Sequence, residues 1–286
     1  MPEGHTLRRL ADDLTAAFAG HPVRVSSPQG RFADSAALLD GSTLLGADSA
    51  GKHLFLDFGG DRLVQIHLGL IGGLDIGEYA AEAGGAEPAP VGQVRLRLLN
   101  DTAYADLRGA MVCELITEAK RDAIVAKLGA DPLRVDADPE RAWARVHKSA
   151  RAIGDLLMDQ KVFAGVGNVY RAEVLFRQRI HPLRPGNTLQ RKQFDAIWAD
   201  LVALMAEGVR LGRIDTVRPE HTPEAMGRPP RVDDHGGEVY VYRRTGLPCH
   251  VCGTSVRTAV LAGRNSFWCP TCQRPYRART VASRRA

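Results

Sequence analysis

Pro2 and Glu3 are the residues of this chain whose types and spacing most readily support covalent chemistry. Initiator methionine is normally removed ahead of a residue as small as proline, so the mature chain would begin with a secondary amine. A free amine can attack a carbon at the aldehyde oxidation level and form an iminium ion, as lysine Schiff bases do. The carboxyl group of Glu3 can move the protons that such a reaction requires. A plain alternative stands beside this one, because proline also fits the first turn of a helix.

A predicted helix follows this pair and would fix its position. Apolar residues recur at helical spacing and a glycine follows as a stop signal: Leu7, Leu10, Leu14, Phe18 and Gly20. Pro2 and Glu3 then fall at the N-terminus of the helix, where the dipole favours a carboxylate and disfavours a charged amine. An ordinary α-amino group titrates at roughly 7.7–8.0, so a small downward shift would leave the amine of Pro2 neutral and nucleophilic.

Two Cys-x-x-Cys pairs near the C-terminus predict a metal centre. Sixteen residues separate the pairs, a spacing typical of a four-thiolate zinc site with Cys249, Cys252, Cys269 and Cys272 as ligands. We therefore expect one structural Zn²⁺ per chain. The alternative, two disulfides, is uncommon in a cytosolic chain.

A β-hairpin is predicted between the two cysteine pairs, with strands at 255–261 and 265–268 and a turn at 262–263. Arg264 falls at the tip of this hairpin, where it could reach a phosphate group. The fifth cysteine, Cys113, lies in a strand-like stretch and is expected to be a buried apolar residue.

Gly165-Val166-Gly167-Asn168 directly precedes a predicted helix. The glycines would let the backbone come close to a ligand, and Asn168 could cap the helix. The N–H groups at such a helix start can hold a phosphate. The plain alternative is a glycine-rich helix start with no ligand.

Composition and charge limit the classes of protein to which the chain could belong. Its 286 residues suffice for two domains or slightly more, and 44% of them are hydrophobic. No apolar run reaches the roughly eighteen residues of a membrane span, and no signal peptide is recognisable, so we expect a cytoplasmic protein. The net charge of +5 favours polyanionic partners, and the basic residues are mostly arginine, the better phosphate ligand.

Periodicity divides the chain into regions. Residues 23–117 are rich in strand-like alternation, with stretches at 53–58, 63–67, 94–99 and 111–116, and predict an antiparallel sandwich or barrel. Helical spacing follows at 121–128, 139–146, 150–158, 169–179 and 189–211. Residues 80–90 have the composition of a loose loop, and residues 216–237 that of a linker or mobile loop. The expected fold class is thus multidomain α+β.

Four segments, in this order and spacing, resemble the formamidopyrimidine-DNA glycosylase and endonuclease VIII family of bacterial base-excision repair enzymes. They are MPEGHTLRRLADDL, GKHLF, QKVFAGVGNVYRAEVLF and the ending VYRRTGLPCHVCGT with GRNSFWCPTCQ. The resemblance covers nearly the whole chain. It implies an N-terminal β-sandwich at 1–118, a helix–two-turn–helix domain at 119–216, a mobile loop at 217–237 and a zinc finger at 238–286.

The resemblance also implies roles for individual residues. Pro2 would attack C1′ of a damaged nucleotide, and Glu3 would protonate the sugar ring oxygen. Three residues would clamp phosphates around the lesion: Lys52, Asn168 and Arg264. Such enzymes flip the damaged nucleotide out of the duplex, and Leu70 matches the position of a wedge that fills the gap. Arg108 is expected to contact DNA.

Departures from the family pattern bear on lesion choice. Gly4 matches the endonuclease VIII branch, Thr6 replaces a second glutamate, and the Arg-Phe-Gly sequence expected after Arg108 is missing. We therefore expect a bifunctional glycosylase and abasic-site lyase that favours oxidised pyrimidines over 8-oxoguanine and cleaves the strand by β,δ-elimination.

Other functions fit the same residues less well. A non-catalytic DNA-damage binder on this fold is disfavoured, because Pro2, Glu3 and Lys52 are all present. A zinc-finger transcription regulator would explain neither the β region nor the N-terminal pair. The expected partner is double-stranded DNA with oxidised bases or abasic sites, bound by a monomer at the bacterial nucleoid.

Overall fold

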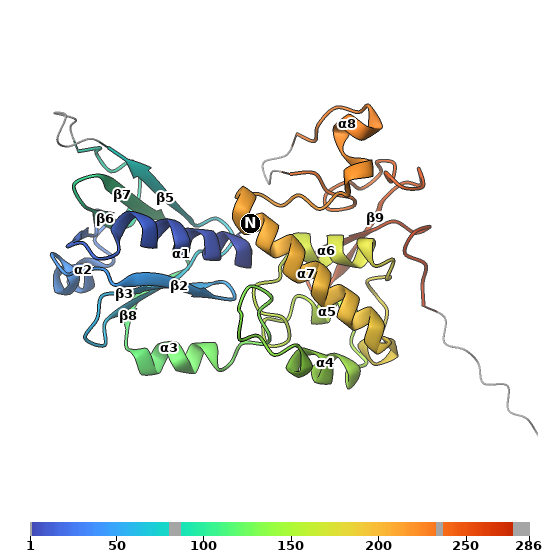
Figure 1. Ribbon diagram of the computed structural model, residues 1–286, viewed down its shortest axis with the longest axis horizontal. Helices are drawn as coiled ribbons and strands as arrows, with labels where there is room; N and C mark the ends of the chain where they lie inside the picture. The colour runs from blue at the N-terminus through green and yellow to red at the C-terminus, as the bar shows by residue number, and fades with distance from the viewer. Residues whose placement is uncertain (1, 80–86, 233–236, 277–286) are drawn as a thin grey trace, which may run out of the picture.

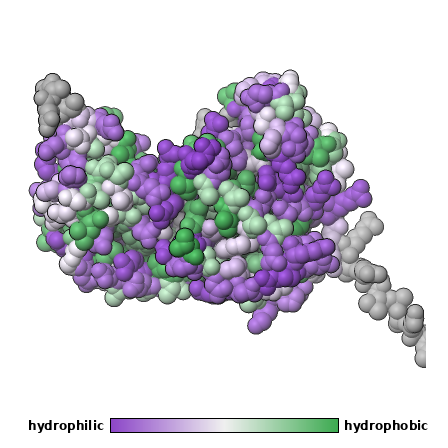
Figure 2. Space-filling model, viewed as in Figure 1, coloured by the Kyte–Doolittle hydropathy of each residue, from purple (hydrophilic) through white to green (hydrophobic). Residues whose placement is uncertain are grey.

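A computed structural model of the chain describes residues 2–79, 87–232 and 237–276. Two lobes lie side by side, one built of strands and one mainly of helices, and α1 begins where they meet (Figure 1). The space-filling view is hollowed between the β5–β7 end of the first lobe and the α8 region of the second (Figure 2). None of the helices in the described part of the chain is long and apolar enough to cross a membrane.

The first lobe is a sandwich of two four-stranded antiparallel sheets, as the alternation predicted. One sheet has the order β1-β6-β7-β5, with β1 Arg24–Ser26, β6 Val94–Leu99, β7 Ala103–Arg108 and β5 Gly73–Glu78. The other has the order β2-β3-β4-β8, with β2 Gly46–Ala50, β3 His53–Asp57, β4 Leu63–His67 and β8 Val112–Ile116.

Four strands escaped the sequence prediction for a physical reason. β2 and β5 carry glycine and aspartate, which are depleted in strands, and β1 has only three residues. β7 buries Asp106 between Ala105 and Leu107, so its hydrophobic alternation is broken.

The predicted opening helix is α1, Gly4–Phe18. It buries Leu7, Leu14 and Phe18 in the core of the sandwich, as its apolar spacing requires. A short helix, α2 Ala33–Leu39, adds Leu39 to the same core, and Cys113 is buried there too.

The predicted helices form, with changes at their ends. α3 Glu118–Val125 packs on the β-sandwich lobe, with Val125 against the small core of Phe55 and Leu63 (Figure 1). The second lobe contains α4 Pro139–His147, α5 Ile153–Leu156, α6 Asn168–Arg177 and α7 Arg191–Leu211. The helix predicted at 150–158 shrinks to one turn. Its first amides bond outward, Ile153 N to Arg184 O and Gly154 N to Pro182 O. A single turn, η1 Gly186–Thr188, precedes α7.

The C-terminal hairpin forms as predicted, with β9 Arg257–Leu261 and β10 Arg264–Trp268. It shares one continuous apolar core with α6 and α7. The segment before it contains η2 Pro219–His221 and α8 Pro223–Met226, short turns that the linker prediction lacked. Residues 80–86 and 233–236 of the predicted loops lie outside the described residues.

Candidate active site at the junction of the two lobes

Glu3 joins the two lobes through its carboxylate. The side chain is fully buried, and its oxygens accept hydrogen bonds from Gly167 N and Val169 N, both at 2.8 Å. Glu3 precedes α1, but its charge sits at the N-terminus of α6, where the helix dipole favours an anion. The N–H groups that were predicted to hold a phosphate therefore hold this carboxylate.

Glycines make this contact possible. A Cβ added to Gly167 would lie 2.3 Å from Cδ of Glu3, and one added to Gly4 would lie 2.8 Å from Cα of Gly165. The backbone of Gly4 also donates to Gly165 O at 2.8 Å. The close approach predicted from the glycine pattern is thus real, but the partner that approaches is the start of α1.

Asn168 does not cap α6, contrary to the prediction. Gly167 is the N-cap residue, and it has no side chain that could cap the helix. Asn168 instead turns its side chain toward the zinc-finger hairpin, where its Nδ2 donates to Asn265 O at 3.1 Å. Its Oδ1 accepts a hydrogen bond from Arg171. Because Gly167 occupies the N-cap position, the side-chain amide of Asn168 is available to tie α6 to the hairpin.

Lys52 occupies the turn between β2 and β3. Gly51 has a positive φ of 58°, and its N–H donates to Asp131 Oδ2 at 2.7 Å, so the second lobe also fixes this turn. Burial lowers the pKa of Lys52; the positive charge of Arg264 adds to the shift and the carboxylate of Glu3 opposes it. Lys52 thus lies within electrostatic reach of both residues.

Burial also raises the pKa of Glu3, although Lys52 and the amides of α6 pull it down. A carboxyl group with a raised pKa can hold a proton nearer to neutral pH and release it to a reacting atom. Pro2, half-buried, precedes this group directly. The junction therefore brings together Pro2, a buried carboxyl group and a cation.

Two histidines beside Lys52 were missed by the sequence analysis. His53 and His67 lie at facing ends of β3 and β4, with ring centroids 5.0 Å apart. Burial lowers the pKa of His67, and the charge of Lys52 lowers it further. His53 lies within the GKHLF segment, and His67 lies three residues before Leu70, so closeness to these two features was the available signal.

Leu70 lies in the exposed turn between β4 and β5, and 60% of its surface is accessible. Ile71 next to it is 89% exposed, and Met111 from the neighbouring β7–β8 connection is 64% exposed. A Cβ on Gly69 would lie 3.1 Å from Cβ of Met111, so these two connections touch. The wedge position is therefore part of an apolar tip of three residues.

Arg108 lies near this tip, because it pairs with Gly73 at the start of β5. Its guanidinium forms ion pairs with Asp75 and Asp106 and donates to Val91 O at 2.7 Å. The structure thus engages Arg108 within the β lobe and does not group it with Glu3, Lys52 and Arg264.

The four cysteines of the finger come together as their spacing predicts. Their Sγ atoms all lie within 4.8 Å of one another, with Cys252 and Cys269 3.4 Å apart and Cys249 and Cys272 3.9 Å apart. Tetrahedral thiolates at about 2.3 Å from Zn²⁺ would be about 3.8 Å apart. The donor set fits one structural zinc ion, which would hold the hairpin and Arg264 in place.

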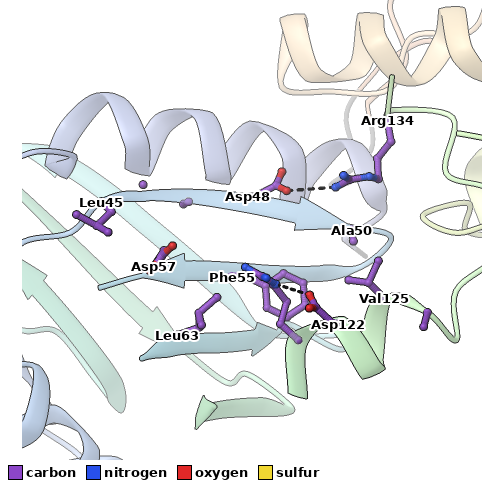
Figure 3. Close-up of a pocket in the computed structure, with 13 residues that line it drawn as sticks. Leu45, Asp48, Ala50, Phe55, Asp57, Leu63, Asp122, Val125 and Arg134 are labelled. Carbon is purple, nitrogen blue, oxygen red and sulfur yellow. Dashed lines mark hydrogen bonds and ion pairs between the residues drawn. The ribbon is translucent and has the colours of Figure 1, made fainter. Parts of the chain in front are cut away.

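A cavity of about 670 Å³ lies away from this junction, between the β2–β4 sheet and α3 (Figure 3). Its floor is apolar and includes Phe55, Leu63 and Val125. Two ion pairs, Asp48 with Arg134 and Arg121 with Asp122, lie at its rim. These charged groups are already paired with one another, so the cavity offers no reactive constellation among the described residues.

Three family models match the chain and cover most of it. Residues 1–113 match the formamidopyrimidine-DNA glycosylase N-terminal domain, residues 128–219 the H2TH domain of that glycosylase, and residues 246–275 a zinc finger found in FPG and IleRS. The matches follow the β-sandwich, the helical lobe and the finger in turn.

Similar proteins span nearly the whole chain. Endonuclease 8 1 of Mycobacterium tuberculosis is 55% identical over 273 residues, 96% of this chain and 100% of the relative. The formamidopyrimidine-DNA glycosylase of Thermus thermophilus is 32% identical over 276 residues, covering 96% of this chain and 97% of the relative. A solved complex of Lactococcus lactis Fpg with abasic-site DNA shares the fold, with a TM-score of 0.75, 23% identity and coverage of 96% and 100%.

Proposed function

Because the chain belongs to the formamidopyrimidine-DNA glycosylase family, we propose that it excises oxidised bases from DNA with Pro2 as nucleophile and then cleaves the strand. As a member it is a DNA glycosylase with abasic-site lyase activity, acting in base-excision repair. The observation that carries the proposed residue roles is the buried carboxylate of Glu3, which directly follows Pro2 and lies within electrostatic reach of Lys52.

In the proposed reaction the neutral amine of Pro2 attacks C1′ of the damaged nucleotide. The C1′–N bond breaks, and the base leaves with its bonding electrons and takes up a proton. Glu3 protonates the ring oxygen, so the sugar opens and an iminium ion links C1′ to Pro2. The iminium acidifies C2′, whose proton is removed as the 3′ phosphate leaves by β-elimination. A second, δ-elimination releases the 5′ phosphate and leaves a one-nucleotide gap.

We assign Lys52, Asn168 and Arg264 to the phosphates around the lesion. These residues come from the β lobe, from α6 and from the hairpin, so a bound duplex would cross the hollow between the lobes (Figure 2). Leu70 would enter the stack with Ile71 and Met111 beside it, since apolar side chains can wedge between bases. Arg108 would support this tip through its ion pairs and touch DNA only at the rim.

We further propose that oxidised pyrimidines are the preferred lesions. Identity is higher to a relative named endonuclease 8 than to relatives named formamidopyrimidine-DNA glycosylase. Gly4 also packs against Gly165, so this marker of the endonuclease VIII branch has a structural reason in the chain itself. The protein would act as a monomer in the cytoplasm, at the nucleoid.

A nicking assay on matched duplexes tests the lesion preference. Duplexes with thymine glycol, dihydrouracil or 8-oxoguanine opposite each base should be compared by kcat/KM, with an abasic duplex as the control for strand cleavage. We expect the two pyrimidine lesions to be cleaved faster than 8-oxoguanine opposite cytosine. Efficient excision of that 8-oxoguanine with poor action on both pyrimidines would overturn the preference.

A further inference from the structure

Arg171 is a buried cation that forms no ion pair with a carboxylate among the described residues. Its side chain is almost fully inaccessible, and its guanidinium donates to Asn168 Oδ1, to Asn265 O at 2.8 Å and to Gly154 O at 3.4 Å. Its Nε finds no hydrogen-bond partner in the described part of the chain. A buried arginine ordinarily requires a paired anion to offset its desolvation.

Arg177 on the same helix shows the usual arrangement. Its guanidinium forms a bidentate pair with Asp200, with N–O distances of 2.7 and 2.8 Å. The two arginines are six positions apart on α6, so the helix itself does not prevent pairing. The lack of a paired carboxylate at Arg171 within the described ranges therefore calls for a separate explanation.

The surroundings of Arg171 hold charges of both signs. Burial lowers the pKa of Arg171 to about 10; the charge of Arg264 adds to this shift, and the carboxylates of Glu3 and Asp155 oppose it. Arg264 in turn lies within electrostatic reach of Lys52. The repulsion among these cations is unfavourable in the free protein, and an anion added beside Glu3 would relieve it further.

The contacts of Arg171 converge on one point of the hairpin. Arg171 and Asn168 both donate to the carbonyl of Asn265, the residue that follows Arg264. This carbonyl is fixed from two sides by α6, while the Arg264 side chain is exposed at the start of β10. The backbone that carries Arg264 is therefore anchored to the helix whose N-terminus holds Glu3.

We propose that Arg171 is a positioning residue for the phosphate clamp. It holds the Asn265 carbonyl and the Asn168 side chain so that Arg264 and Asn168 face one phosphodiester, and its buried charge strengthens the field there. Arg171 does not touch the DNA. The inference rests on the proposed function, because the anion that completes the cluster is a phosphate beside the lesion.

A double-mutant cycle tests this role. Arg171→Met and Arg264→Ala, alone and combined, should be titrated by fluorescence anisotropy against a duplex with a tetrahydrofuran abasic analogue. Arg177→Met is the matched control, since it removes an arginine of α6 that lies outside the clamp. Melting temperature and zinc content should be measured for every variant.

We expect Arg171→Met to raise Kd about tenfold, and less than threefold when Arg264 is already alanine. Arg177→Met should lower the melting temperature but change Kd less than twofold. Should Arg171→Met not fold, Arg171→Lys replaces it in the cycle: it keeps the charge, loses the fork of donors, and should raise Kd about threefold with the same coupling.

The proposal would be overturned if the fold increase in Kd of the double variant equalled the product of the two single increases. An unchanged Kd in the single Arg171 variant would also overturn it. The readout is separate from excision. If the cycle shows this coupling but the wild-type protein excises no base, only the proposed reaction is refuted. If the wild-type protein has no affinity for that duplex, both the proposed reaction and the role of Arg171 are refuted.

Discussion

The lobe junction and the cavity between the β2–β4 sheet and α3 both contain acidic and basic side chains, but these side chains differ in burial and in pairing. At the junction Glu3 and Arg171 are buried without an ion-pair partner among the described residues, and Lys52 and Arg264 lie within electrostatic reach of each other. At the cavity Asp48 lies 3.0 Å from Arg8 and 3.2 Å from Arg134, and these side chains are between 33% and 57% exposed. The cavity has volume, whereas the junction holds buried charge: a carboxylate and cations within electrostatic reach of one another. Such charge marks functional sites more specifically than an open space does.

Loss of the metal is the strongest way to break the junction. Structural zinc contributes roughly 10 kcal/mol or more of apparent binding energy to small zinc domains, so Cys249→Ser or chelation should unfold the finger. Arg264 would then leave the junction while the sandwich stays folded. Metal analysis should give one zinc per wild-type chain, with DNA affinity falling as zinc is removed. Metal-free protein with full affinity would contradict this part of the account.

Replacing the buried carboxylate should affect the reaction and spare binding. Glu3→Gln removes the proton carrier, and base release should fall about 100- to 10,000-fold, or roughly 3–5 kcal/mol in the barrier. The new amide would place an N–H against an α6 N–H, so a lower melting temperature is also expected. Affinity for an abasic duplex serves as the control and should change less than threefold. Excision within tenfold of wild type would remove Glu3 from the chemistry.

A buried histidine makes the stability of the junction depend on pH. His5 packs its ring edge-on against Tyr170, and burial lowers the pKa of His5 to about 4. The unfolded chain, with a histidine pKa near 6.5, binds more protons between pH 6.5 and 4. The free energy of unfolding should therefore fall by up to about 3 kcal/mol as pH drops through this window.

Urea unfolding at several pH values measures this slope. His5→Phe should flatten it by the contribution of one histidine, whereas His21→Phe at an exposed position should leave it as in the wild type. An unchanged slope in His5→Phe would show that the neutral state of His5 does not stabilise the fold.

The cavity should tolerate the same kind of change with little effect. Arg121 and Asp122 form an exposed pair, and such pairs contribute roughly 0–1 kcal/mol. Asp122→Ala should shift the melting temperature only slightly and leave kcat/KM and DNA affinity within twofold of wild type. A tenfold loss of excision would place the cavity in the functional site and invert the comparison.

Short-range signals predicted most of the scaffold. The spacing of Leu7, Leu14 and Phe18 gave α1 its buried face, and the cysteine spacing predicted a cluster that forms in the structure. Four strands gave no such signal, because they contain glycines or a buried aspartate or are short.

The site itself depends on contacts that no local pattern contains. Glu3 meets Gly167 across 164 positions, and Arg171 meets Asn265 across 94. The glycines before α6 predicted a close approach but could not identify its partner. Asn168 was mistaken for a cap because the capping preference is local, whereas its actual partner lies in the hairpin. The family resemblance supplied residue roles, and these stay predictions until they are measured.

Covalent trapping tests the central claim, that the amine of Pro2 attacks the sugar. The wild-type protein should be mixed with a cleavable lesion duplex in the presence of borohydride, and the adduct digested and sequenced by mass spectrometry. We expect the reduced iminium to give one enzyme–DNA adduct attached at the nitrogen of Pro2, and protein that retains Met1 to give none. Active cleavage of the lesion with no trapped adduct, or an adduct on another residue such as Lys52, would contradict the account.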